Sequence, residues 1–337
     1  MQKKEIIKLF NSFNHLNVLI IGDVMVDSYL WGKVDRISPE APVPIVSVKN
    51  RENRLGGAAN VALNIKALGA NPILCSVIGN DQKGQEFIGL LEAQKMDTSG
   101  IIFSNGRITT TKFRVIGNKM QMLRVDEETE KPLDSNDQKA FYKSFDRIIA
   151  KKKIDVIIFQ DYDKGVISED LISKVVKIAT KKEIPVAVDP KKRNFKAYRG
   201  VTLFKPNLKE LKEGLNIDCD SKDQNQLRKA VTQLNQLLKA KMILLTLSED
   251  GVFIEYRQNG EKSTRILPSH VRSIADVSGA GDTVISVAAL CLALKIDPAV
   301  LAAVSNLAGG LVCEKPGVVP VDKKQLIQET MMLNITL

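Results

Sequence analysis

Short apolar runs rich in β-branched residues alternate with helix-patterned segments along most of this chain. Several of the runs are apolar without interruption, which is typical of strands that helices cover on both faces. The alternation predicts a doubly wound α/β fold with a mostly parallel central sheet. The expected strands are 18–21, 73–78, 156–160, 185–189, 201–204, 242–247 and 252–255, and the expected helices are 58–68, 84–95, 135–152, 169–182, 224–239, 283–295, 298–307 and 323–332.

Two stretches interrupt this alternation, at about 28–52 and about 106–126. The first contains three prolines beside an alternating apolar pattern, and the second contains two short strand-like runs. We expect strands from both stretches to pair into a small accessory sheet, a lid over the edge of the main sheet. Because exposed apolar strands favour pairing with a second copy, the lid also predicts a homodimer. The whole chain, 1–337, is expected to form one domain with this lid inserted.

Composition and charge narrow the classes of function. No apolar run reaches the roughly 20 residues of a membrane span, and Glu5 and Lys8 interrupt the N-terminal stretch where a secretory signal would be apolar. We therefore expect a cytoplasmic protein without a membrane partner. Two histidines and four scattered cysteines disfavour a histidine-centred hydrolase, a disulfide framework and a zinc knuckle. The net charge of +10 favours an anionic partner, and with only 5% aromatic residues a small phosphorylated substrate is favoured over nucleic acid.

The strongest local signal is the segment 276–283, Asp-Val-Ser-Gly-Ala-Gly-Asp-Thr, which opens an almost wholly apolar helix. The small residues Gly279, Ala280 and Gly281 would let a phosphate approach backbone N–H groups, and the helix N-terminus supplies positive potential. Asp282 would then be placed to take a proton from an attacking hydroxyl. Taken alone, Asp282 could equally be a cap or a first-turn acid, which is a common role.

Two weaker signals lie near the N-terminus. Gly56 and Gly57 open a helix with Asn60 in its first turn, so a ligand hydroxyl could approach the backbone there; tight helix–sheet packing is the alternative. Asp27 follows the first strand at the edge where open α/β sheets bind ligands, and could hold sugar hydroxyls or be a solvated acid. The sequence contains no P-loop, no protein-kinase catalytic loop and no dinucleotide fingerprint.

In combination, these motifs resemble those of the ribokinase-like (pfkB) carbohydrate kinases over nearly the whole chain. The segment 56–60 (Gly-Gly-Ala-Ala-Asn) resembles the family's first signature and 276–282 its second. Between them, 205–210 (Lys-Pro-Asn-Leu-Lys-Glu) resembles the family's Pro-Asn-x-x-Glu segment, and 246–251 (Thr-Leu-Ser-Glu-Asp-Gly) its nucleotide-binding turn. The resemblance implies a ribokinase-like sandwich with a small β lid. Within the family, the strings at 22–27, 36–44, 161–165 and 189–191 are similar to the heptose-7-phosphate kinases of lipopolysaccharide inner-core synthesis.

That branch implies transfer of the ATP γ-phosphoryl group to the anomeric O1 of D-glycero-β-D-manno-heptose 7-phosphate, giving the 1,7-bisphosphate on the route to ADP-heptose. Asp282 would be the base, and the N–H groups of Gly279, Ala280 and Gly281 would stabilise the transferred group. The residues expected to hold sugar hydroxyls are Asp27, Gly56, Gly57 and Asn60. The candidates for the 7-phosphate are Arg114, Arg124, Lys164 and Lys191, although each could equally be a surface ion-pair partner.

On the nucleotide side, the resemblance implies Mg²⁺ bridging the ATP phosphates through water, with Glu210 and Asn207 organising that shell. The expected nucleotide-lining residues are Thr246, Ser248, Gly251 and Asn306. Asp276 matches a residue beside a monovalent-cation site of the family, which leaves activation by K⁺ open. Two departures are notable: position 248 is Ser where many members have Gly, and Met25 replaces a polar residue used for pentose, which argues against ribose.

Two alternatives stay open at this stage. One is a kinase of the same fold for another sugar or sugar phosphate, such as a fructose phosphate. The other is a non-catalytic sugar or nucleotide sensor, although a sensor need not retain Asp282. Many heptose kinases carry a C-terminal nucleotidyltransferase domain, and this chain stops after the kinase. We therefore expect a separate heptose-1-phosphate nucleotidyltransferase to act downstream.

Overall fold

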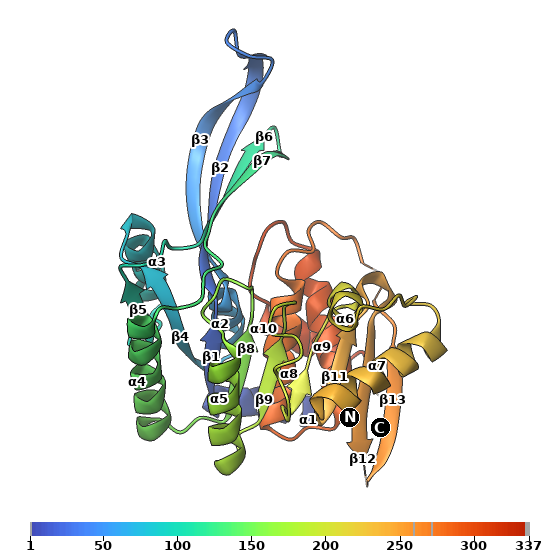
Figure 1. Ribbon diagram of the computed structural model, residues 1–337. Coiled ribbons are helices and arrows are strands. Elements are labelled where there is room, and N and C mark those ends of the chain that lie inside the picture. The colour runs from blue at the N-terminus through green and yellow to red at the C-terminus, as the bar shows by residue number, and fades with distance from the viewer. Residues whose placement is uncertain (1, 259, 271, 334–337) are drawn as a thin grey trace.

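The computed structural model describes residues 2–258, 260–270 and 272–333 of the chain. These residues form a main body, in which helices cover both faces of a large sheet, and a second sheet that projects from one edge of the body (Figure 1). The doubly wound α/β body and the small β lid that the sequence predicts are both confirmed.

The central sheet has nine strands among the described residues, in the order β13-β12-β11-β10-β9-β8-β1-β4-β5. Pairing is parallel from β11 through to β5, whereas β12 is antiparallel to both β11 and β13. The strands are β1 Asn17–Gly22, β4 Asn71–Gly79, β5 Ile101–Ser104, β8 Val156–Gln160, β9 Val186–Asp189, β10 Leu203–Phe204, β11 Met242–Thr246, β12 Val252–Gln258 and β13 Glu261–Leu267.

Two apolar cores lie on opposite faces of this sheet. In β1, Val18 and Ile20 belong to one core and Leu19 and Ile21 to the other, because successive side chains of a strand point to opposite faces. The helices that pack in the first core are α1 Lys3–Ser12, α2 Ala58–Ala67, α3 Gln82–Ala93, α8 Ala280–Ala293, α9 Pro298–Cys313 and α10 Lys323–Thr330. Those of the second are α4 Ser135–Lys151, α5 Glu169–Lys181, α6 Leu208–Leu215 and α7 Gln224–Leu238.

The lid is a four-stranded sheet in the order β3-β2-β6-β7, in which β2 and β6 are parallel and the other pairs are antiparallel. Its strands are β2 Val24–Ile37, β3 Pro44–Gly57, β6 Thr111–Gly117 and β7 Met120–Glu127. The β2–β3 ribbon extends well beyond β6 and β7 (Figure 1). Both long strands begin or end inside the body, so the expected sugar residues Asp27, Gly56 and Gly57 belong to the root of the lid.

Some elements differ from the sequence prediction. The polar strand β13 lacks an apolar pattern and is held by its antiparallel pairing with β12. The short helix α6 begins with a capping box in which Asn207 and Glu210 each accept the other's backbone N–H. Helix α9 continues to Cys313 instead of ending at 307. Among the described residues, no helix combines the length and the apolar character that crossing a bilayer requires.

Candidate active site

The candidate site lies where the parallel strands end and the N-terminus of α8 begins. Gln160 and Asp189 are the last residues of β8 and β9, and Lys205 follows β10 directly. Because these strands are adjacent and parallel, their carboxyl ends meet at one edge of the sheet. Helix α8 packs against β8, β9 and α2, which brings Asp282 in its first turn to the same edge.

Asp282 is buried, and both oxygens of its carboxylate accept hydrogen bonds. The amide Nδ2 of Asn60 donates to Oδ2 over 2.6 Å, and the Tyr162 hydroxyl donates to Oδ1 over 2.7 Å. The Gln160 amide also donates to Oδ1, over 3.2 Å. Burial raises the pKa of Asp282 to about 6, although the Asn60 and Tyr162 donors oppose that shift. A carboxylate that titrates so close to neutrality suits a general base.

The backbone at the start of α8 can receive an anion. Gly279 adopts a left-handed conformation (φ 82°) before the helix begins, and the Ala280 N–H donates to the Val277 carbonyl over 3.3 Å. Within the described residues, the N–H groups of Gly279, Gly281 and Asp282 have no acceptor. These three N–H groups can therefore face a ligand, and the positive end of the α8 dipole lies behind them.

Lys205 supplies a buried positive charge beside this helix start. Its Nζ lies 3.0 Å from Asp189 Oδ1, and a methyl group on Gly281 would lie only 3.6 Å from the same Nζ. The ammonium group therefore borders the space above Gly281, where a phosphate would meet the free N–H groups. In the sequence, Lys205 precedes the Pro-Asn-x-x-Glu segment, and that position alone predicts no role for it.

Of the expected sugar-hydroxyl residues, Asp27, Gly56 and Gly57 lie at the root of the lid, and Asn60 lies in the first turn of α2. Asp27 is buried and forms an ion pair with Arg114. A methyl group on Gly56 would lie 2.3 Å from Asp27 Oδ2. Gly57 has φ +60°, and a methyl group there would lie 2.5 Å from the Asp23 carbonyl oxygen. Tight packing thus explains both glycines. Asn60 is committed to Asp282 through Nδ2, while its buried Oδ1 has no donor among the described residues and remains able to accept one.

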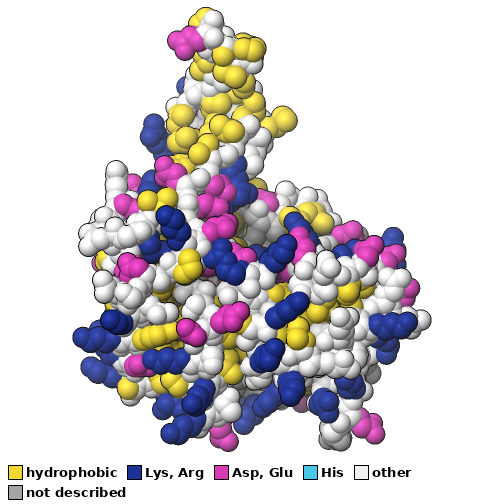
Figure 2. Space-filling model, in the orientation of Figure 1, with side chains coloured by type: hydrophobic (Ala, Val, Ile, Leu, Met, Phe, Trp, Pro, Cys, Tyr) yellow, Lys and Arg dark blue, Asp and Glu magenta, His cyan; other side chains and the backbone are white. Residues whose placement is uncertain are grey.

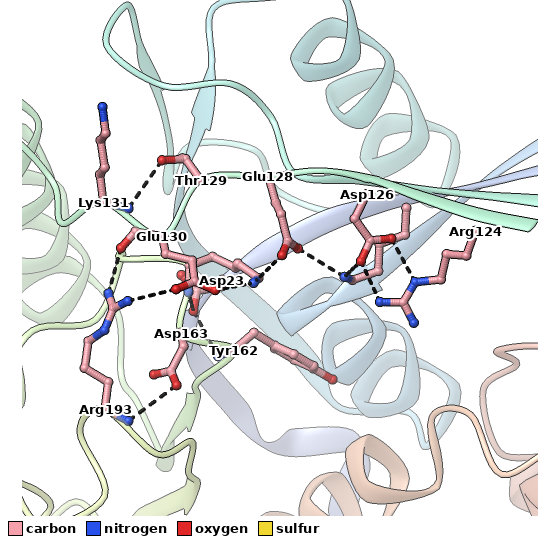
Figure 3. A network of polar contacts seen from close by, with 12 residues as sticks. Asp23, Arg124, Asp126, Glu128, Thr129, Glu130, Lys131, Tyr162, Asp163 and Arg193 are labelled. Carbon is pink, nitrogen blue, oxygen red and sulfur yellow. Dashed lines mark hydrogen bonds and ion pairs between the residues drawn. The ribbon is translucent and has the colours of Figure 1, made fainter.

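The four basic residues assigned to the sugar phosphate do not all lie together, although Arg114 and Arg124 are cross-strand partners in the β6–β7 pair. Arg124 is half-exposed on the lid and pairs with Asp126. Lys164 lies 2.8 Å from Glu128, and Lys191 pairs with Glu210. Lys112 joins Asp126 to Glu128, and Lys164 joins Glu128 to Glu130. With Arg124 at one end and Arg193 at the other, this series of ion pairs runs from the lid past the loop after β8 to the segment after β9 (Figure 3). Of the four, Arg114 stands beside Asp27 at the root of the lid.

The nucleotide-side residues surround the ends of β10 and β11. Asn207 and Thr246 form an isolated parallel bridge. Ser248 has φ +54°, a conformation that favours glycine, and the Asn306 amide donates to the Pro268 carbonyl over 2.9 Å. A methyl group on Gly251 would lie 2.1 Å from the Leu267 carbonyl oxygen. These residues therefore outline the turn between β11 and β12 together with the end of β13.

Two acids were expected near metal ions. Glu210 Oε2 accepts the Asn207 N–H over 2.9 Å and Oε1 meets Lys191, so this carboxylate fits a metal shell through water better than as a direct ligand. Burial raises the pKa of Glu210. Asp276 accepts the N–H groups of Ser278 and Gly317, which hold its pKa below the usual range against partial burial. Among the described residues, no three His, Cys, Asp or Glu side chains are grouped to hold a metal ion.

Sequence reasoning missed the roles of four residues that contact Asp282 or flank the helix start: Gln160, Tyr162, Asp189 and Lys205. Each is the last residue of a strand of the parallel sheet or follows one within two positions. That position was the available signal, since ligands of open α/β sheets bind at this edge.

The fold and this site define a carbohydrate kinase. The family profile "pfkB family carbohydrate kinase" matches residues 15–324, and the chain therefore belongs to that family. Curated relatives include the bifunctional protein HldE of Aliarcobacter butzleri, 41% identical over 89% of this chain and 61% of its own length. The HldE protein of Desulfatibacillum aliphaticivorans is 39% identical over 93% of this chain and 63% of its own length. The chain thus spans less than two thirds of these relatives.

Solved structures confirm the ribokinase-like fold. Phosphofructokinase-2 from Escherichia coli in complex with fructose-6-phosphate is similar with a TM-score of 0.75 at 17% identity, covering 94% of this chain and 98% of that one. Arabidopsis thaliana ribokinase complexed with ribose and ATP is similar with a TM-score of 0.68 at 16% identity, covering 95% and 99%. At such low identity the likeness concerns the fold.

Proposed function

We propose that this chain transfers the γ-phosphoryl group of ATP to the anomeric O1 of D-glycero-β-D-manno-heptose 7-phosphate, on the route to ADP-heptose for lipopolysaccharide. The observation that carries the reaction type is the buried Asp282 beside free N–H groups at the start of α8, with Lys205 alongside. The heptose assignment is supported by the HldE relatives and by the sequence strings shared with heptose kinases.

In the proposed reaction, the sugar O1 attacks the γ-phosphorus while the bond from the γ-phosphorus to the β–γ bridging oxygen breaks and ADP leaves. The O1 proton passes to Asp282. The transition state of phosphoryl transfer is loose and places charge on the three equatorial oxygens. The N–H groups of Gly279, Gly281 and Asp282 and the ammonium of Lys205 would stabilise that charge. Because Ala280 already donates to Val277, it contributes less than the sequence predicts.

Mg²⁺ bound to the ATP phosphates would neutralise their charge, and Glu210 with Asn207 would orient its water shell. Glu210 fits this role because its carboxylate is fixed by the Asn207 N–H and by Lys191. Asp276, fixed by two backbone N–H groups next to the 276–283 segment, is the proposed neighbour of a K⁺ ion. Thr246, Ser248, Gly251 and Asn306 would line the nucleotide.

On the sugar side, Asp27 and the Oδ1 of Asn60 would accept sugar hydroxyls, and Arg114 is the proposed ligand of the 7-phosphate. Arg114 lies beside Asp27 at the root of the lid. Arg124 lies opposite Arg114 in the β6–β7 pair and would bind the same phosphate, whereas Lys164 is held by Glu128 and Glu130. Closure of the lid would also exclude water from the transferred group.

We also propose that the lid pairs two copies of the chain. Figure 2 shows apolar side chains gathered on the projecting lid, and those that are exposed include Ile37, Val43, Val48, Met120, Met122, Leu123 and Val125. Every residue of the edge strand β7 is exposed. Leu123→Asp/Val125→Asp should convert a dimer into a monomer in light scattering, whereas Met332→Asp, an exposed apolar residue after α10, should not. A monomeric wild type would refute the pairing.

A kinase for a different phosphorylated sugar is the second candidate, supported by the likeness in fold to phosphofructokinase-2. The test is ADP release with Mg²⁺ and ATP, offering the heptose 7-phosphate beside ribose, fructose 6-phosphate and fructose 1-phosphate. Turnover confined to the heptose, with a new anomeric phosphate in phosphorus NMR, is expected. Turnover with another sugar would overturn the substrate. Unchanged turnover in Asp282→Asn would overturn the mechanism, and silence with all four sugars would favour a sensor.

A further inference from the structure

The loop that follows β8 carries a tyrosine that contacts the proposed base. The Tyr162 hydroxyl donates to Asp282 Oδ1 over 2.7 Å, which is shorter than the 3.2 Å contact from the Gln160 amide to the same oxygen. In the sequence, Tyr162 served only as part of a string shared with heptose kinases. The structure gives its side chain a contact with the reacting group.

The backbone of this loop is fixed by a second buried carboxylate, that of Asp23. Its two oxygens accept the N–H groups of Tyr162, Lys164 and Val166 over 2.9, 3.1 and 3.0 Å. Figure 3 shows Asp23 beside the loop, with the Tyr162 side chain directed away from it. The tyrosine is therefore held at both ends, by Asp23 at its backbone and by Asp282 at its hydroxyl.

We propose that Tyr162 is a positioning residue that fixes the orientation of the Asp282 carboxylate toward the sugar hydroxyl. The inference rests on the proposed function, in which Asp282 is the base. Asn60 donates to Oδ2, and both Tyr162 and Gln160 donate to Oδ1, so these bonds restrain rotation of the carboxylate and leave one lone pair, on Oδ2, for the sugar hydroxyl. Fixing a base in this way reduces the loss of entropy in the transition state.

The same hydrogen bond favours the ionised form of Asp282, which is the form that can accept a proton. Burial and the carboxylate of Asp189 raise the pKa of Asp282, while Asn60, Tyr162 and Lys205 lower it. Burial and the nearby carboxylates raise the pKa of Tyr162 well above 10, so the phenol stays a donor across the working range. Lys191 lies over the Tyr162 ring, 5.7 Å from its centroid.

Tyr162→Phe tests the proposal because it removes one oxygen and keeps the ring. A hydrogen bond to a charged group contributes enough to shift a pKa by about one unit. The acidic limb of the pH profile of kcat/KM for the sugar, at saturating ATP and excess Mg²⁺, should therefore move about one pH unit upward. At the pH optimum kcat should fall on the order of tenfold, while KM changes little, because the tyrosine acts through the base.

The chain offers a matched control in Tyr198→Phe. The Tyr198 hydroxyl is also buried and also donates to a carboxylate over 2.7 Å, but its acceptor is Asp161, which does not contact Asp282. This variant removes the same group from the interior and should leave the acidic limb in place. The proposal would be overturned if the acidic limb of the kcat/KM profile did not shift in Tyr162→Phe, or if it shifted equally in both variants.

A measurement without substrate separates this inference from the proposed function. The Asp282 carboxyl carbon, assigned by its loss in Asp282→Asn, can be titrated by NMR in the unliganded protein. Its midpoint should be higher in Tyr162→Phe than in the wild type and unchanged in Tyr198→Phe, whether or not the heptose is turned over. Equal midpoints in all three proteins would refute the role of Tyr162. Should Tyr162→Phe not fold, a ring-fluorinated tyrosine at 162, a stronger donor, should lower the midpoint instead.

Discussion

Replacing Lys205 by Met should lower both the stability and the activity of the protein, for different reasons. Lys205 and Asp189 form a buried ion pair 3.0 Å apart, with side chains only 3% and 9% exposed. Removing the ammonium leaves an unpaired buried carboxylate, which costs about 3–5 kcal/mol of unfolding free energy. It also removes a positive charge beside Gly281, and losing one such stabilising group lowers kcat about 10²–10³-fold.

The double variant Lys205→Met/Asp189→Asn separates the two effects. Because replacing both members of a buried ion pair is often close to neutral, the unfolding free energy should recover most of its loss. The activity should stay as low as in the single variant, because the charge beside the phosphoryl group is still missing. Urea unfolding and ADP release measure the two quantities. If activity returns together with stability, Lys205 serves only as the partner of Asp189, and its proposed role in phosphoryl transfer is refuted.

Three glycine substitutions give further predictions. Gly281→Ala should fold normally, since its methyl group meets nothing closer than 3.6 Å, yet lower kcat on the order of 100-fold by occupying the place of the phosphoryl group. Gly279→Ala should cost about 1–2 kcal/mol of unfolding free energy in thermal or urea melts, because its φ of 82° disfavours a side chain. Gly56→Ala should raise KM for the sugar roughly five- to tenfold with a smaller change in kcat, because its methyl group displaces Asp27. A Gly281→Ala enzyme of full activity, a Gly279→Ala protein of unchanged stability or an unchanged KM in Gly56→Ala would each contradict the geometry behind it.

Much of the fold could be predicted from the sequence because the buried strands have no polar interruption. β8 and β9 are buried along their whole length and were located within one residue. β13 and α6 escaped prediction for physical reasons. A polar edge strand such as β13 depends on its neighbour for hydrogen bonds, and α6 depends on a capping box more than on apolar periodicity. Strand β10 was predicted over 201–204, and only Leu203 and Phe204 pair with the neighbouring strands β9 and β11.

The residues of the site likewise fall into two groups, those that the sequence could show and those that it could not. Asp282 and the glycines around it are contiguous in the chain, so a sequence motif can show them. Gln160, Asp189 and Lys205 come from three different strands, and only the strand order of the folded sheet brings them together. The sequence also predicts Asn60 as a sugar ligand, whereas the structure first shows it as a donor to Asp282, 222 residues away in the chain.

The net charge of +10 suggested an anionic partner. In the structure, however, the donors available to an anion at the site are backbone N–H groups and not the charged side chains. The cations near the ends of β8, β9 and β10 are paired: Lys205 with Asp189 and Lys191 with Glu210. At the root of the lid, Arg114 is paired with Asp27. Because each charge is largely balanced locally, an incoming phosphoryl group gains most from donors that have no internal partner. Those donors are the N–H groups at the start of α8, which accounts for the small residues Gly279, Ala280 and Gly281 at the beginning of a mostly apolar helix.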